Sequence, residues 1–159
     1  MKSKKNISIS EVGVEGAALL SVIHKEAFYS EYVQQWQQKD FVELLSIPGT
    51  VSFLISNVDQ PIGFILIRNI KDEAEIITFC ILPKWCRNGY ATYLLEWVIN
   101  RLQQQSVKRF FLEVNENNDA AINLYQKCSF KKIGRRKGYY KSHHGAKTDA
   151  LVMQIQLTD

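Results

Sequence analysis

The chain has 159 residues, of which 46% are hydrophobic and 23% are charged, and its net charge is +4 at pH 7. This length and balance are typical of a soluble globular protein, and we expect a single domain over residues 1–159. No apolar run is long enough to cross a bilayer, and the start MKSKKNISIS lacks the apolar stretch of a signal peptide, so we expect a cytoplasmic protein with no membrane partner.

The N-terminal third of the chain predicts a strand followed by helices. Ile7–Val12 alternates apolar and polar residues, a pattern that predicts a strand. Val14–Phe28 has residues at helical spacing and predicts a helix. Phe41–Leu45 predicts a second helical segment, which Pro48 and Gly49 stop.

The middle of the chain predicts three strands and a strong helix. Thr50–Ser56 and Gly63–Ile70 are strand-like and are joined through Asn57–Pro61, which predicts a hairpin with a loop longer than two residues. Glu73–Leu82 predicts a further strand, ended by Pro83. An amphipathic helix with one buried face follows, because these apolar residues keep the i, i+3, i+4, i+7 spacing: Ala91, Leu94, Leu95, Val98, Ile99 and Leu102.

The C-terminal third predicts more strands and one more helix. Arg109–Val114 predicts a short buried strand, and Asn118 or Asp119 can cap the helix that carries Tyr125. Three strand-like stretches close the chain: Phe130–Ile133, Tyr139–Tyr140 and Ala150–Leu157. The predicted elements begin with β-hairpins and continue in the order β-α-β-α-β-β. This order predicts an α+β fold with a mostly antiparallel sheet, whose faces the helices cover.

Cysteine usage and charge narrow the class of protein. Cys80, Cys86 and Cys128 occur without CxxC spacing, which is typical of free thiols and argues against a disulfide framework or a zinc site. Much of the positive charge gathers at Met1–Lys5 and Lys131–Lys137. Such runs are usually solvated, and contact with the phosphates of a cofactor or of RNA is the alternative. Since no nucleic-acid-binding motif accompanies them, we expect no direct nucleic-acid partner.

The stretch Cys86–Ala91 is a candidate phosphate-binding turn. It lies between a predicted strand and the strong helix, and the N–H groups of a helix's first turn favour anions because they have no partner inside the helix. Gly89 allows a phosphate to approach the backbone closely, and Arg87 could add a charge-assisted hydrogen bond. The chain lacks the G-x-G-x-x-G of a dinucleotide-binding fold and the GK[ST] of a P-loop, which argues against both classes.

This turn and the segment downstream together resemble the GNAT family, the GCN5-related N-acetyltransferases. The acetyl-CoA signature of that family is Q/R-x-x-G-x-G/A at the start of a helix. Gly89 and Ala91 match it, and Cys86 stands in place of the first residue. In that family the backbone amides of the turn hold the pyrophosphate of CoA.

The downstream segment, LEVNENNDAAINLYQKCSF, resembles the RimI-type branch of the family, which acetylates the N-terminal alanine of a small-subunit ribosomal protein. Ser129 stands in place of the branch's usual glycine, and Arg135-Arg136 and Tyr139-Tyr140 also match. The matching positions in the segment are Leu112, Glu113, Val114, Asn118, Ala121, Leu124, Tyr125 and Phe130.

The resemblance implies a three-layer α/β/α fold with a mixed, mostly antiparallel sheet of about seven strands, about four helices, acetyl-CoA as cosubstrate and no metal. By position, Glu113 would be the general base and Tyr125 the general acid when an amine attacks the thioester directly. Asn118 would reach the cofactor near its thiol end. Backbone groups for the pantetheine arm would come from Phe79, Cys80 and Ile81. The turn that holds the pyrophosphate would be Arg87, Asn88, Gly89, Tyr90, Ala91 and Thr92.

The expected acceptor is a protein N-terminus, of a small-subunit ribosomal protein, and we expect a monomer or weak homodimer. At pH 7 roughly one α-amine in ten is neutral, but only about one lysine in 2,500, a gap of about 3 kcal/mol. A single carboxylate with a water therefore suits an α-amine better. Two alternatives remain open: another acceptor, such as a small-molecule amine or an internal lysine, which the divergent Tyr29–Gln35 favours, and a CoA-binding module without catalysis.

Overall fold

The computed structural model describes residues 6–29, 35–141 and 145–158. The basic start of the chain, most of Tyr29–Gln35 and residues 142–144 therefore lie outside the described residues. The chain forms two compact units, each described by itself below. The first comprises Met1–Arg68 and Ile77–Leu94, and the second comprises Asn69–Ile76 and Leu95–Asp159. A single domain over residues 1–159 stays a prediction.

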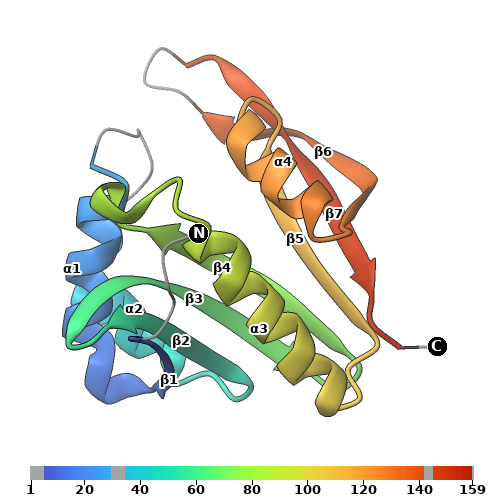
Figure 1. The fold of residues 1–159 in the computed structure, drawn as a ribbon. Helices are drawn as coiled ribbons and strands as arrows, with labels where there is room; N and C mark the ends of the chain where they lie inside the picture. The colour runs from blue at the N-terminus through green and yellow to red at the C-terminus, as the bar shows by residue number, and fades with distance from the viewer. Residues whose placement is uncertain (1–5, 30–34, 142–144, 159) are drawn as a thin grey trace. The chain divides into compact units, whose positions relative to one another are not determined.

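The described residues form four α-helices and seven strands, which confirms the α+β prediction (Figure 1). The strands hydrogen-bond in the order β1-β2-β3-β4-β5-β7-β6, with β4 and β5 parallel and the neighbours β1-β2, β2-β3, β5-β7 and β7-β6 antiparallel. No helix in the described part of the chain is long and apolar enough to cross a membrane. The elements are β1 (Ile7–Val12), η1 (Val14–Gly16), α1 (Ala17–Ala27), α2 (Gln38–Leu45), β2 (Thr50–Asn57), β3 (Gln60–Ile70), β4 (Glu73–Ile81), η2 (Pro83–Trp85), α3 (Tyr90–Gln104), β5 (Arg109–Asn115), α4 (Asp119–Lys127), β6 (Lys131–Lys141) and β7 (Lys147–Gln156).

The hairpin between β2 and β3 corrects one sequence prediction. Only Val58 and Asp59 separate the strands, and Asn57 pairs with Gln60. The prediction of a loop longer than two residues was therefore wrong. Val58 takes a left-handed backbone (φ 54°), which closes the tight turn. Pro61 marked a loop in the sequence, but it lies beside a register shift in the ladder, where a residue without an N–H is tolerated.

The C-terminal strands correct a second sequence prediction. The two short strands predicted around Ile133 and at Tyr139–Tyr140 are parts of one strand, β6, whose pairing with β7 shifts register twice. Most of its side chains are exposed because β6 is an edge strand, so the apolar alternation that identifies a half-buried strand is weak.

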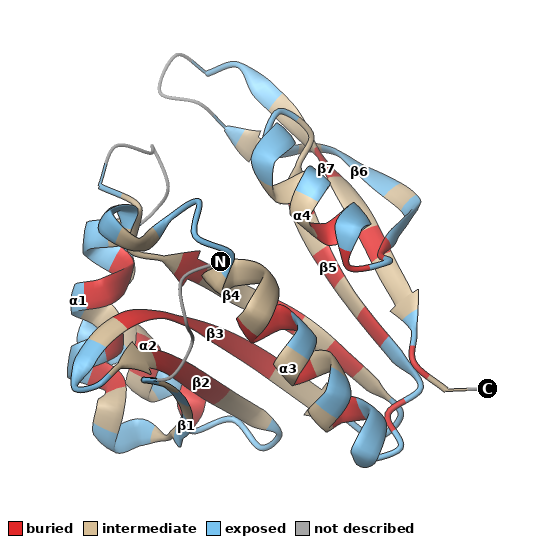
Figure 2. Ribbon diagram, viewed as in Figure 1, coloured by how far each residue is buried: buried red, intermediate tan, exposed pale blue. Residues whose placement is uncertain are grey.

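In the first unit, α1 and α2 pack against one face of β2 and β3 (Figure 2). The buried residues of this cluster are Ala17, Leu20, Ile23, Phe41, Leu45, Leu54, Phe64, Leu66 and Cys80. Gly63 lets β3 and β4 approach closely, because a Cβ there would lie 2.2 Å from the carbonyl oxygen of Cys80. This close approach positions the end of β4, which contains the candidate cofactor-binding residues Phe79–Ile81.

In the second unit, alternate residues of β5 divide between two environments. Phe110, Leu112 and Val114 are buried, whereas Glu113 and its neighbours at every second position are partly exposed. The ring of Phe110 lies 5.5 Å from that of Phe130, which follows α4. The strand thereby presents Glu113 on the face that is less buried.

Candidate active site

The turn before α3 has an unusual backbone. Cys86 is extended, and Arg87 and Gly89 are left-handed, with φ of 62° and 81°. Helix α3 starts at Tyr90, and the N–H of Tyr93 donates to the carbonyl of Gly89 at 3.0 Å. Left-handed residues let successive N–H groups converge on a concave surface that suits anions. The turn thus combines two left-handed residues with the start of a helix.

Side chains brace this turn from within. The Asn88 amide donates to the carbonyls of Cys86 and Trp85, at 2.9 and 3.2 Å. The Cys86 thiol lies 3.5 Å from the carbonyl oxygens of Ile81 and Leu82, close enough for weak hydrogen bonds. Asn88 and Cys86 therefore hold the shape of the turn with their side chains, and the N–H of Cys86 is itself taken by the carbonyl of Pro83 at 3.2 Å.

The space beside Gly89 tests whether the turn fits a phosphate. A Cβ built on Gly89 would meet nothing within 4 Å, so no protein atom fills that side of the backbone. The first N–H groups of α3 have no acceptor inside the helix, and the helix dipole favours negative charge there. The open backbone and the N–H donors fit a pyrophosphate.

The end of β4 is the second part of the predicted cofactor site. The Cys80 thiol is packed in the core of the first unit, and burial raises its pKa to about 12. Phe79 and Ile81 are partly exposed, and the N–H of Leu82 is already taken by the carbonyl of Ile62 at 2.8 Å. Any contact of Cys80 with a cofactor would therefore be through its backbone, as the sequence predicts.

The predicted base, Glu113, is held by an arginine from β6. Both carboxylate oxygens accept from one nitrogen of Arg136, Nη1, at 2.9 and 3.1 Å. The Glu113 side chain is 21% exposed and that of Arg136 55% exposed. In the register, Glu113 pairs with Val152 of β7, and Val152 pairs with Gly134 of β6. Since Gly134 has no side chain, the side chain of Arg136 can extend over Gly134 and reach the Glu113 carboxylate.

The predicted acid, Tyr125, lies on α4 and is 8% exposed. Its ring lies 5.7 Å from that of Phe130, and burial, followed by the neighbouring Tyr140, raises the pKa of its phenol. Burial, then Tyr139 and the Glu113 carboxylate, raises the pKa of Tyr140 to about 12. Tyr140 is thus electrostatically coupled to both predicted catalytic residues, and both phenols remain protonated at neutral pH.

A bulge in β6 shapes this region. Arg136 pairs with Ala150 and Tyr140 pairs with Thr148, so three residues, 137–139, face Asp149 alone. Gly138 is left-handed (φ 63°), and its N–H donates to the Asp149 carboxylate at 2.9 Å. The bulge places the ring of Tyr139 4.2 Å from the guanidinium carbon of Arg136.

Sequence reasoning gave no catalytic role to Arg136, Tyr139 or Tyr140. The signal was present, because these residues match the pattern of the RimI-type branch, but a pattern match does not reveal which carboxylate an arginine meets. The sequence also predicted that Asn118 or Asp119 caps the helix, and the structure confirms Asn118 in that role, whereas its contact with the cofactor stays a prediction. Its Oδ1 accepts the N–H of Ala121 at 3.2 Å and caps α4.

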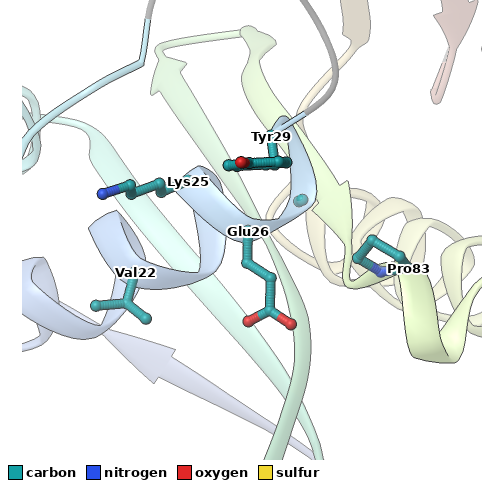
Figure 3. A pocket seen from close by; sticks show the side chains of 6 residues that line it. Val22, Lys25, Glu26, Tyr29 and Pro83 are labelled. Atoms are coloured by element: carbon teal, nitrogen blue, oxygen red, sulfur yellow. The ribbon is translucent and has the colours of Figure 1, made fainter.

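A surface hollow lies at the C-terminal end of α1, within the first unit (Figure 3). Its volume is about 600 Å³, and it is lined by Val22, Lys25, Glu26, Ala27, Tyr29 and Pro83. The lining combines apolar surface with one acidic and one basic residue. The hollow is lined by none of the predicted catalytic residues. Pro83 lies two residues after Ile81, where β4 ends, and Tyr29 is the first residue of the divergent stretch.

The predicted site residues are distributed over both units. Phe79–Ile81 and Arg87–Thr92 belong to the first unit, and Glu113, Asn118 and Tyr125 belong to the second. Within the described ranges, no group of three or more His, Cys, Asp or Glu residues could hold a metal ion.

Known proteins resemble the chain over most of its length. A model of the acetyltransferase (GNAT) family matches residues 21–130. The [ribosomal protein bS18]-alanine N-acetyltransferase of Haemophilus influenzae is 36% identical over 104 residues, which are 65% of this chain and 70% of that protein. The Escherichia coli protein of the same name is 29% identical over 125 residues, or 77% and 82% of the two chains. The crystal structure of the ribosomal-protein-S18-alanine N-acetyltransferase from Escherichia coli superimposes with a TM-score of 0.87 and 25% identity, over 96% of this chain and 95% of that one.

Proposed function

The chain belongs to the acetyltransferase (GNAT) family, whose enzymes take the acetyl group from acetyl-CoA, and we propose that it acetylates the N-terminal alanine of a ribosomal protein. The choice of acceptor rests on the similarity to two bacterial proteins named as alanine N-acetyltransferases of ribosomal protein bS18. The family match spans the turn at Gly89 and both Glu113 and Tyr125.

The residues of the first unit would bind the cosubstrate, which supplies an acetyl thioester. The N–H groups at the start of α3 and the open backbone of Gly89 would hold the pyrophosphate. Arg87, exposed on the same turn, would add positive charge. Phe79–Ile81 would pair with the pantetheine arm through backbone groups, in the manner of an added strand.

Glu113 would remove the proton from the acceptor amine. A carboxylate has about four acceptor positions, and the contacts of Arg136 use two of them. The remaining positions can receive a proton from the amine, directly or through a water. An ammonium has no lone pair with which to attack a carbonyl carbon, so this step has to precede acetyl transfer.

Tyr125 would donate its phenolic proton towards the sulfur that leaves. Burial raises the pKa of this phenol, so the hydroxyl remains protonated at neutral pH and is available as a donor. A donor at this point matters because the thiolate carries the negative charge that develops as the carbon–sulfur bond breaks. No covalent bond between the protein and the acetyl group is needed.

The test is acetyl transfer to a short peptide with a free N-terminal alanine, compared with the same peptide blocked at its N-terminus and carrying one lysine. Mass spectrometry locates the acetyl group. We expect modification of the free α-amine, and loss of most of the turnover in Glu113→Gln. Preferential acetylation of the lysine, of spermidine or of another small amine would contradict the proposed acceptor and leave the family assignment intact.

A further inference from the structure

The Glu113 carboxylate is not an isolated negative charge. Arg136 contacts both of its oxygens, at 2.9 and 3.1 Å, and carries the compensating positive charge. The hydrogen bond with Glu113 raises the pKa of Arg136, and the nearby Glu75 acts in the same direction. The groups of this unit that act electrostatically on the pair include the Glu75 carboxylate and the phenols of Tyr139 and Tyr140.

Arg136 is itself fixed in place. The Tyr139 ring lies 4.2 Å from its guanidinium carbon, a distance at which a cation and an aromatic face attract. Tyr139 belongs to the bulge of residues 137–139, which the hydrogen bond from Gly138 to Asp149 stabilises. Arg135, next in the chain, points to different carboxylates, those of Glu116 and Asp149. Two adjacent arginines thus have separate partners, and one of them is committed to Glu113.

We propose that Arg136 is a positioning residue, which holds the Glu113 carboxylate in the orientation from which it accepts the proton of the acceptor amine. This inference rests on the proposed function, because it gives Glu113 the role of base.

The physical reason is geometric. A carboxylate accepts a proton efficiently only when one of its oxygens is within hydrogen-bond reach of the donor. The two contacts from Arg136 Nη1 restrain the rotation of the Glu113 carboxylate. The acceptor positions that Arg136 does not use stay available to the amine or to a bridging water.

The experiment compares steady-state kinetics of the wild-type protein with three variants. In Arg136→Gln we expect kcat to fall roughly 10- to 100-fold, with the KM for acetyl-CoA unchanged, because a displaced base costs rate and not cofactor affinity. Arg136→Lys should recover most of the rate, since a single nitrogen makes both contacts with Glu113. Arg109→Gln is the matched control, because it removes another exposed arginine–glutamate pair of the same unit, with Glu73, and should leave kcat unchanged.

A double-mutant cycle identifies the route of the effect. If Arg136 acts through Glu113, then Arg136→Gln changes nothing further in a Glu113→Gln background. A full additional loss in that background, or a kcat within twofold of wild type in Arg136→Gln alone, would overturn the inference. Thermal unfolding of each variant separates these results from a fold defect, which would lower both kcat and the melting temperature.

Hydrolysis of acetyl-CoA without any acceptor gives a second readout. If the wild type acetylates no peptide but hydrolyses acetyl-CoA, the proposed acceptor fails and the same cycle on hydrolysis still decides the role of Arg136. Absence of both reactions from the wild type would overturn both proposals.

Discussion

The side-chain oxygen of Asn118 accepts the backbone N–H of Ala121 at 3.2 Å, which makes Asn118 the N-cap of α4. The resemblance to the family gives the same residue a contact with the cofactor. Both roles are compatible, because the cap uses Oδ1 and leaves the Nδ2 donor free. Helix α4 also carries Tyr125, so the cap helps to fix the start of the helix that positions the predicted acid.

Two substitutions at Asn118 separate these roles. Asn118→Asp retains a capping oxygen and should keep stability, whereas Asn118→Ala should cost about 1 kcal/mol in urea unfolding. Both remove the amide donor, so we expect the KM for acetyl-CoA to rise about threefold to tenfold in each. An unchanged KM in Asn118→Asp would rule out the cofactor contact.

Gly89→Ala should weaken acetyl-CoA binding more than it destabilises the fold. The left-handed backbone at Gly89 costs an alanine roughly 1 kcal/mol, and the new methyl group would occupy the open space proposed for the pyrophosphate. We expect the dissociation constant for acetyl-CoA, measured by calorimetry, to rise about tenfold or more, the equivalent of about 1.4 kcal/mol.

Gly145→Ala is the control for that experiment. Gly145 is also left-handed (φ 75°), and its Cβ would likewise meet nothing within 4 Å. The stability cost should therefore be similar, but acetyl-CoA binding should not change. Equal losses of affinity in the two variants would show that the turn at Gly89 is not the binding site.

Tyr125→Phe should abolish most turnover with little effect on folding. The substitution removes the hydroxyl and keeps the ring that packs near Phe130. We expect kcat to fall roughly 100-fold or more, as is usual when a proton donor is lost, while acetyl-CoA still binds. Rapid single-turnover measurements check that the chemical step has slowed, and unchanged turnover would exclude Tyr125 as the acid.

His24 should make the protein sensitive to acid. Its imidazole is 2% exposed, it stacks on Trp36 at 5.2 Å, and burial lowers its pKa from 6.5 to about 4. The folded state therefore binds fewer protons than the unfolded state between pH 6.5 and 4, and stability falls as the pH falls through this window. The loss from this residue between pH 7 and 4 should be about 3 kcal/mol.

Urea unfolding of wild type and His24→Phe at pH 7, 5.5 and 4 measures this contribution. The variant removes the titrating group and keeps an aromatic ring, so the difference in unfolding free energy between the two proteins should shift in favour of the variant at low pH. A difference that is the same at all three pH values would show that His24 is not the group responsible.

Local patterns predicted the elements whose apolar residues recur at a clear period. The amphipathic spacing from Ala91 to Leu102 predicted α3, and the alternation of Ile7–Val12 predicted β1. The prediction was wrong at the loop around Pro61, where an irregular ladder absorbed a residue that usually marks a loop. It divided β6, because an exposed edge strand has no buried face to produce a pattern.

The sequence by itself determined the family, because the spacing of Gly89 and Ala91 and of Glu113 and Tyr125 lies within short segments that fold locally. It also determined that Glu113 alternates with buried residues on its strand, since side chains alternate between the two faces of a sheet. Only the tertiary structure decided that Arg136, and not Arg135, meets that carboxylate. Arg136 and Glu113 are 23 positions apart, and β7 lies between their two strands in the sheet. The bulge at 137–139 and the missing side chain at Gly134 orient the arginine, and both depend on the register between β6 and β7.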